Sequence, residues 1–135
     1  MKTITKNLIS HLIVLLLVLF SSCDKDASDI YIIGKWNIDK FTIIETLFDE
    51  SSEETHYNAG TITFANDESG VFTFMDEISV FTWTLSDNVL ILKEQDGNAI
   101  IDYIIEQNNK NELILDYHRE YEGGYERRSF HLTKL

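Results

Sequence analysis

Proline is absent from the 135-residue sequence, and cysteine occurs once, at Cys23. An average chain contains about 5% proline. Without proline, every backbone N–H of a strand remains free to join the hydrogen-bond ladder of a sheet. A single cysteine excludes an intrachain disulfide. Turns must therefore be made by glycine, asparagine and aspartate, and short runs of these residues recur along the chain.

Basic residues are also scarce, since 11 Lys and Arg stand against 23 Asp and Glu for a formal net charge of −12. Lys2 and Lys6 lie in an N-terminal leader that has no acidic residue, so the chain without the leader carries a charge of −14. Such a charge repels nucleic-acid phosphates and anionic lipid surfaces, and it favours solubility. We therefore expect no nucleic-acid partner and a covalent rather than an electrostatic attachment to any membrane.

The leader has the three parts of a secretion signal. Its lysines are followed by an unbroken apolar run at Leu12–Phe20, which is shorter than the roughly 20 residues of a transmembrane helix. The stretch Leu19–Cys23 (LFSSC) then resembles a lipobox, with Phe20 bulkier than the usual leucine. The resemblance implies cleavage before Cys23 and a lipid on its thiol. The alternative, a secreted protein with a spare thiol, leaves a lone cysteine at this boundary unexplained.

The predicted organisation is a signal peptide at residues 1–22, a lipidated Cys23 with a tether to residue 31, and one domain at residues 32–135. Removal of the leader leaves 113 residues, enough for a single hydrophobic core. The segment Asp24-Lys25-Asp26 resembles tags that send lipoproteins to the outer membrane in some Gram-negative groups and retain them at the inner membrane in others. We expect a lipid-anchored protein of the cell envelope, at the outer membrane, facing either the periplasm or the cell surface.

Beyond the tether, short runs rich in β-branched and aromatic residues alternate with turn residues, and no window has a helical period. The acidic segment at residues 49–54 is expected to be a mobile loop. Eight strands are predicted, at Gly34–Phe48, Gly60–Phe64, Gly70–Met75, Val80–Ser86, Val89–Glu94, Ala99–Gln107, Glu112–Tyr121 and Tyr125–Thr133.

Tight turns predict the register of four hairpins. Two-residue turns are expected at Asp87-Asn88, Asp96-Gly97 and Gly123-Gly124, with a three-residue loop at Asn108-Asn109-Lys110. Each register brings large apolar side chains together on one face of the sheet. The predicted strand Gly70–Met75 is ambiguous, because either Val71 and Thr73 or Phe72 and Phe74 can face inward. The predicted pairs are Trp83 with Leu92, Leu85 with Leu90, Leu92 with Ile101, Leu90 with Tyr103, Ile105 with Leu113, Tyr117 with Phe130, and Leu115 with Leu132.

Four short segments form a pattern along the chain: Gly34-Lys35-Trp36, Gly60–Phe64, Ser69–Phe72 and Phe81–Asn88. Through these segments, the sequence resembles the lipocalin-like domain of bacterial envelope lipoproteins over roughly residues 33–134. The resemblance implies an all-β fold, an eight-stranded antiparallel up-and-down barrel with Trp36 plugging its base. Lipocalins place a basic residue of the closing strand over this tryptophan, and Lys134 is the only basic residue near the right end. The family mostly has no assigned activity.

Two arginines give the most specific hypothesis for ligand recognition. The Gly123-Gly124 register places Arg119 directly opposite Arg128 on the inward face near the rim. Like charges across a ladder are unfavourable, so either acids such as Glu122 and Glu126 neutralise them or the barrel mouth accepts an anion, for which paired guanidiniums are suited. The inward aromatic residues line a ligand site or simply fill the core. The candidate ligand-binding residues are Arg119, Arg128, Trp83, Tyr103 and Tyr117.

The outer face of the last predicted hairpin carries a cluster of potential metal ligands. There Asp116, His118 and Glu120 share one strand face, and the predicted register sets His131 opposite Asp116. These residues can hold a transition metal, or they can form a solvated face with a Glu120–Arg127 ion pair and an Asp116–His131 hydrogen bond. We favour the solvated face and predict no metal, no cofactor and, since no catalytic constellation is seen, no enzymatic activity.

Two functions remain. In the first, the protein is a generic binding module for a small apolar or amphipathic ligand, such as an anion held by the two arginines, and its barrel should contain a cavity of about 300 Å³ or more. In the second, a filled barrel acts as an interaction or accessory subunit of an envelope complex through an exposed apolar patch. Val89, Ile91 and Ile114 are the candidates for such a patch.

Overall fold

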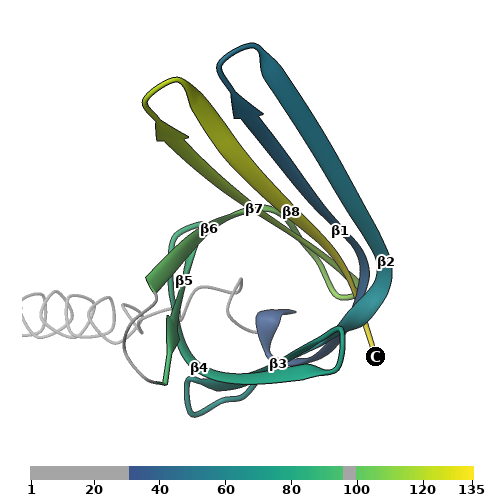
Figure 1. Cartoon of the computed structure of the whole chain (residues 1–135). Helices are drawn as coiled ribbons and strands as arrows, with labels where there is room; N and C mark the ends of the chain where they lie inside the picture. Colours follow the sequence, from purple (N-terminus) through teal and green to yellow (C-terminus); the bar gives the residue numbers. More distant parts are fainter. Residues whose placement is uncertain (1–30, 96–99) are drawn as a thin grey trace, which may run out of the picture.

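The computed structural model, which describes residues 31–95 and 100–135, is a closed eight-stranded antiparallel barrel (Figure 1). Each strand pairs with its neighbour in sequence, and β8 returns to pair with β1. The predicted fold class is therefore confirmed. The strands are β1 (Gly34–Leu47), β2 (Glu50–Phe64), β3 (Ser69–Phe74), β4 (Glu77–Ser86), β5 (Val89–Glu94), β6 (Ile100–Asn108), β7 (Glu112–Tyr121) and β8 (Gly124–Lys134).

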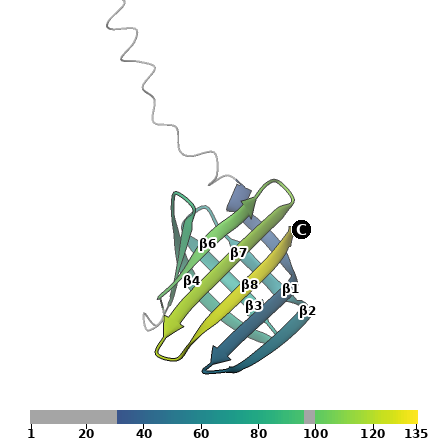
Figure 2. The same ribbon diagram turned by 90° about the horizontal axis from the view of Figure 1, so that it is seen from above.

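The signal peptide, Cys23 and nearly all of the tether lie outside the described residues, so their assignment stays a prediction. Within the described ranges, no helix has the length and apolar character needed to cross a membrane. A short helical turn at Tyr31 and Ile32 leads into β1. Figure 2 shows this turn and the C-terminus at one end of the barrel and the tips of two long hairpins at the other. We call these the closed end and the open end.

The registers predicted around β5 are confirmed. Trp83 pairs with Leu92 and Leu85 pairs with Leu90, across a turn in which Asp87 has a φ of 54°. On its other side, β5 pairs with β6 in the predicted register, Leu90 opposite Tyr103 and Leu92 opposite Ile101. Alternation of side chains then places these residues on the inner face of the barrel.

The register predicted for the last hairpin is wrong by two residues. Tyr117 lies opposite Arg128 and Leu115 opposite Phe130, because the turn is Glu122-Gly123 rather than Gly123-Gly124. Gly123 supplies the positive φ, 85°, whereas Gly124 is needed for a different reason: a Cβ there would lie 1.8 Å from the carbonyl oxygen of Thr46 on β1. A shift of two residues preserves the inward and outward faces of both strands.

The Ile105–Leu113 pair is also wrong, because the turn lies at Lys110-Asn111 rather than at the predicted three-residue loop Asn108-Asn109-Lys110, and because β6 contains an irregularity between Ile105 and Gln107. Ile105 lies opposite Leu115, and Asn108 lies opposite Leu113. An extra residue on one strand of an antiparallel pair shifts every later partner. The sequence-based register, which assumed a three-residue loop and a regular ladder through this hairpin, therefore fails on both sides of the irregularity.

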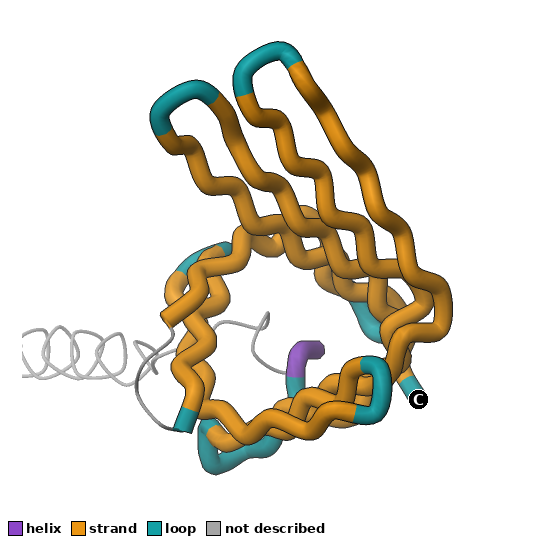
Figure 3. The backbone as a smooth tube through the Cα atoms, in the orientation of Figure 1, coloured by secondary structure: helices purple, strands orange, loops and turns teal. Residues whose placement is uncertain are grey.

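The acidic segment at residues 49–54 is not the expected loop, because β2 begins at Glu50 and pairs with β1 along its whole length. The β1–β2 and β7–β8 hairpins extend beyond the barrel wall at the open end (Figures 1 and 3). There they form a four-stranded sheet in the order β2-β1-β8-β7, which we call the overhanging sheet. Its two tips are joined by a hydrogen bond of 2.5 Å from the Phe48 N–H to the Gly123 carbonyl oxygen.

Trp36 plugs the closed end, as the resemblance implied. It is fully buried, and its indole Nε1 donates a hydrogen bond of 2.7 Å to the Ile32 carbonyl oxygen. The Lys134 ammonium lies 4.3 Å from the centroid of the Trp36 ring and donates to the carbonyl oxygens of Tyr31 and Ile33. Because burial desolvates this ammonium, the pKa of Lys134 is lowered. The expected basic residue is thus present above the tryptophan.

Candidate functional site

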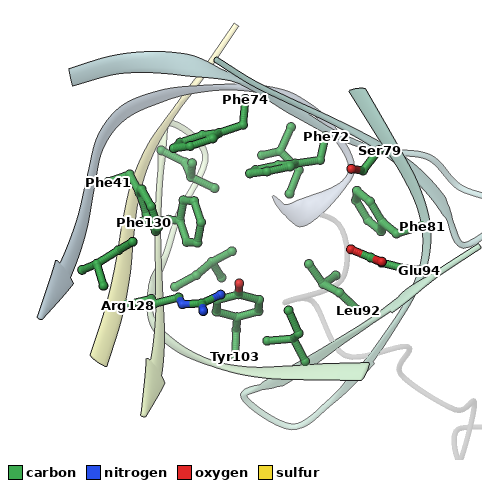
Figure 4. A pocket seen from close by; sticks show the side chains of 15 residues that line it. Phe41, Phe72, Phe74, Ser79, Phe81, Leu92, Glu94, Tyr103, Arg128 and Phe130 are labelled. Atoms are coloured by element: carbon green, nitrogen blue, oxygen red, sulfur yellow. The ribbon is translucent and has the colours of Figure 1, made fainter. Parts of the chain in front are cut away.

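Above this plug the barrel is not filled. A cavity of about 380 Å³ lies toward the open end, and its walls are mostly aromatic and aliphatic (Figure 4). Its polar side chains are Ser79, Glu94, Arg128 and Tyr103, which carries a hydroxyl. Six aromatic residues line it: Phe41, Phe72, Phe74, Phe81, Tyr103 and Phe130. The cavity is therefore an apolar container with few polar groups, which is the usual composition of a small-molecule site.

Strand β3 contributes Phe72 and Phe74 to this wall, which decides between the two facings that the sequence left open. Phe74 packs edge-on to Phe41, with ring centroids 5.1 Å apart, and Phe72 packs edge-on to Phe130 at 6.0 Å. Val71 points outward and is 42% exposed. Such edge-to-face pairs add stability beyond the burial of their area. Contacts between the aromatic rings therefore stabilise the wall of the cavity.

Tyr103 is the most buried polar side chain of the wall, with 5% of its surface exposed. Its ring lies 5.7 Å from that of Phe130 and 6.1 Å from that of Tyr117. Burial raises the pKa of Tyr103 to about 12, and the charge of Arg128 opposes this rise. The phenol therefore keeps its proton and remains a hydrogen-bond donor at any physiological pH. Within the described part of the chain, no residue forms a hydrogen bond with its hydroxyl.

Arg128 reaches the cavity from β8, where it lies opposite Tyr117 of β7. Its guanidinium carbon is 5.6 Å from the Tyr117 ring centroid, and its Nε forms an ion pair with the Glu126 carboxylate. In Figure 4 the guanidinium projects inward beside the hydroxyl of Tyr103. Of the five candidate ligand-binding residues, Arg128 and Tyr103 line the cavity.

The other three candidates do not line it. Arg119 is exposed and lies opposite Glu126, so the predicted side-by-side pair of Arg119 and Arg128 is wrong, for the same reason as the register. Tyr117 supports Arg128 and Tyr103 from behind. Trp83 packs against Phe64 at 5.7 Å and donates to two backbone carbonyl oxygens below the cavity.

The outer face of the last hairpin is an ion-paired surface. Because of the changed register, Asp116 forms its ion pair with Arg127, and His131 lies opposite Ile114. The predicted Glu120–Arg127 and Asp116–His131 contacts are therefore wrong. His118 Nε2 lies 3.4 Å from a carboxylate oxygen of Glu120. Across residues 31–95 and 100–135, no group of three or more potential ligands is placed to hold a metal ion.

Two polar residues of the cavity, Glu94 and Ser79, were missed in the sequence. Each continues an alternation that was already visible: Glu94 follows the inward Leu90 and Leu92, and Ser79 precedes the inward Phe81. The period of two predicts that both side chains face inward. Glu94 was included in the predicted strand Val89–Glu94 and Ser79 lay one residue before the predicted strand Val80–Ser86, but neither was considered as a site residue.

Comparison with known proteins gives a family and one structural neighbour. Residues 32–115 match the family described as lipocalin-like domain. A crystal structure of a lipocalin-like protein from Bacteroides uniformis is similar, with 14% identity, a TM-score of 0.49, and coverage of 77% of this chain and 98% of that chain. No curated protein matches the chain.

Proposed function

Since the chain belongs to the lipocalin-like domain family, we propose that it is a binding protein that holds a small apolar or amphipathic molecule inside its barrel. The observation that carries this proposal is the cavity of about 380 Å³ with its aromatic wall. Ligand pockets begin at roughly 300 Å³ and present few, well-placed polar groups. Binding rather than catalysis is what the family supports.

The filled-barrel alternative has less support. It requires a packed interior, but the wall leaves room for a ligand. Val89, Ile91 and Ile114, its candidates for an apolar docking patch, are half-buried among their neighbours on the outer face. Single half-buried residues of this kind are ordinary for a protein surface.

A titration with N-phenylnaphthylamine, an uncharged apolar fluorophore, tests the proposal. We expect saturable binding to the natural protein. Leu92→Trp replaces an aliphatic side chain of the cavity wall by a bulky indole, which takes up space inside the cavity and should weaken the affinity at least tenfold. Ile91→Trp adds the same ring on the outer face of the same strand, so it is the matched control and should bind like the natural protein. Absence of saturable binding, or equal loss in both variants, would contradict a ligand site in the barrel.

We also propose that Cys23 carries a lipid that anchors the domain to the cell envelope, at the outer membrane. The support is the lipobox-like stretch Leu19–Cys23 and the position of the sole cysteine at its end. Cys23→Ala should abolish labelling by a radioactive fatty acid and release the domain from the membrane fraction. A variant that stays membrane-bound would instead mean that the apolar leader itself is an uncleaved anchor.

A further inference from the structure

We propose that the Tyr103 hydroxyl and the Arg128 guanidinium form the polar end of the cavity and select an uncharged apolar molecule with a hydrogen-bond acceptor oxygen, such as an aryl ketone. The inference rests on the proposed function, because it names the ligand class of the same cavity. It also differs from the anionic ligand that the sequence suggested, because the two arginines of that hypothesis do not face each other.

The first argument is the Tyr103 hydroxyl, which is accessible from the cavity. It is not one of the buried side-chain atoms that lack a partner, and none of the residues described in the structure forms a hydrogen bond with it, so its donor is free for a ligand. The side chain is buried and lines the cavity. Because burial raises the pKa of Tyr103 to about 12, the phenol keeps its proton and is able to donate it to a ligand. A ligand oxygen that accepts this hydrogen bond would complete the site.

The second argument is the partial use of Arg128. A guanidinium has five N–H donors, and the Glu126 carboxylate lies against its Nε side. The terminal nitrogens point into the cavity beside Tyr103 (Figure 4). Both side chains lie against the ring of Tyr117. Two donors from different strands, β6 and β8, therefore reach the same cavity, whose other polar side chains are Ser79 and Glu94.

The third argument concerns charge and weighs against an anionic head group. Glu126 offsets the charge of Arg128, and Glu94 adds a second carboxylate to the cavity wall. In the part of the chain that the structure describes, no cation is paired with Glu94. The three groups together carry one net negative charge, and the whole chain is strongly acidic. A ligand carboxylate would meet repulsion here, whereas a neutral carbonyl oxygen would accept the same hydrogen bonds without it.

Three naphthalenes substituted at the same ring position test the inference with the full chain. Acetylnaphthalene carries a ketone, isopropenylnaphthalene replaces that oxygen by a CH₂ group of the same shape, and naphthoate carries a carboxylate. Affinities are measured by competition with N-phenylnaphthylamine. We expect acetylnaphthalene to bind roughly tenfold more tightly than isopropenylnaphthalene, the usual value of a hydrogen bond to a buried donor, and more tightly than naphthoate. Tyr103→Phe should reduce the preference for the ketone to about threefold or less and leave the affinity for isopropenylnaphthalene unchanged.

Glu94→Gln is the test of the charge argument, and it should strengthen naphthoate binding several-fold without changing the affinity for acetylnaphthalene. Failure of all three probes to bind would overturn the proposed function itself. Binding of all three with equal affinity, or naphthoate binding tightest, would overturn the inference and leave the proposed function standing. An equal loss for all three probes in Tyr103→Phe would likewise overturn it, since that result describes a wall residue and not a donor.

Discussion

The two ends of the barrel are built from the same eight strands and differ in how completely their polar groups are satisfied. At the closed end, the Trp36 indole and the Lys134 ammonium both donate to backbone carbonyl oxygens, and the two side chains contact each other. Toward the open end, within the described residues, the Tyr103 hydroxyl and the Glu94 carboxylate have no protein partner. From this difference we expect stability to be concentrated at the plug, and the proposed recognition of a ligand then falls to the cavity above it.

The largest effect is expected at the plug. Trp36→Ala removes a fully buried ring, its hydrogen bond and its contact with Lys134, and should lower the free energy of unfolding by about 4–5 kcal/mol. Phe74→Ala at the open end should cost about half as much or less, because this ring borders a cavity and has fewer contacts to lose. Urea denaturation measures both. Equal costs would mean that the two ends contribute alike to stability.

The second prediction separates the inner from the outer face below the cavity. Trp83 is 6% exposed and donates to two backbone carbonyl oxygens, so Trp83→Ala should cost about 3–4 kcal/mol. Asp102 is exposed on the outer face of β6, and Asp102→Ala should change the free energy of unfolding by less than about 0.5 kcal/mol. Thermal denaturation of the pair checks this, and similar costs would refute the assignment of faces.

The third prediction concerns the ammonium over the plug. Lys134→Met keeps the length of the side chain and removes its cation–π contact and its hydrogen bonds to the Tyr31 and Ile33 carbonyl oxygens. We expect a loss of about 1–2 kcal/mol in the free energy of unfolding. Lys110→Met, at an exposed loop position, is the control and should be neutral. If both variants unfold at the same urea concentration as the natural protein, the ammonium does not secure the plug.

The smallest effect is a pH dependence from the open end. The folded-state pKa of Tyr103, about 12, lies above the ordinary value of 10.0, so the folded state holds this proton where the unfolded chain has lost it. The stability that this provides is present below pH 10 and is lost as the pH rises from there toward 12. Relative to Tyr103→Phe, the natural protein should lose about 1 kcal/mol between about pH 9 and pH 11. Parallel curves in urea denaturation would contradict the raised pKa.

The sequence predicted the barrel and most of its inner face because side chains alternate between the two faces of a strand. Residues separated by an even number of positions therefore share a face, whatever the exact register. The registers on both sides of β5 were correct because these ladders are regular, with no shift between the paired strands. The β7–β8 register failed because Gly123 and Gly124 look alike in the sequence, although one provides a positive φ and the other allows β1 to approach.

The candidate site was predicted less well than the fold. Tyr103 and Arg128 were identified from their inward facing, but Arg119 was added only through the incorrect register. The sequence did not decide whether the barrel contains a cavity, because aromatic residues on an inner face can fill a packed core as readily as they line a ligand cavity. Whether space remains between them depends on barrel diameter and on side-chain packing, which no local pattern encodes.

The overhanging sheet has a consequence for how copies of this protein meet. Its outer strands are free edges: within the described residues, β2 pairs with β3 only over Gly60–Phe64, so its first half has an unpaired ladder. A free edge is a template for a strand of another molecule, which leads to aggregation. Glu50, Glu53 and Glu54 lie along this edge and are exposed. Two such edges approaching each other bring these carboxylates together, so the acidic run keeps crowded molecules from joining into a continuous sheet.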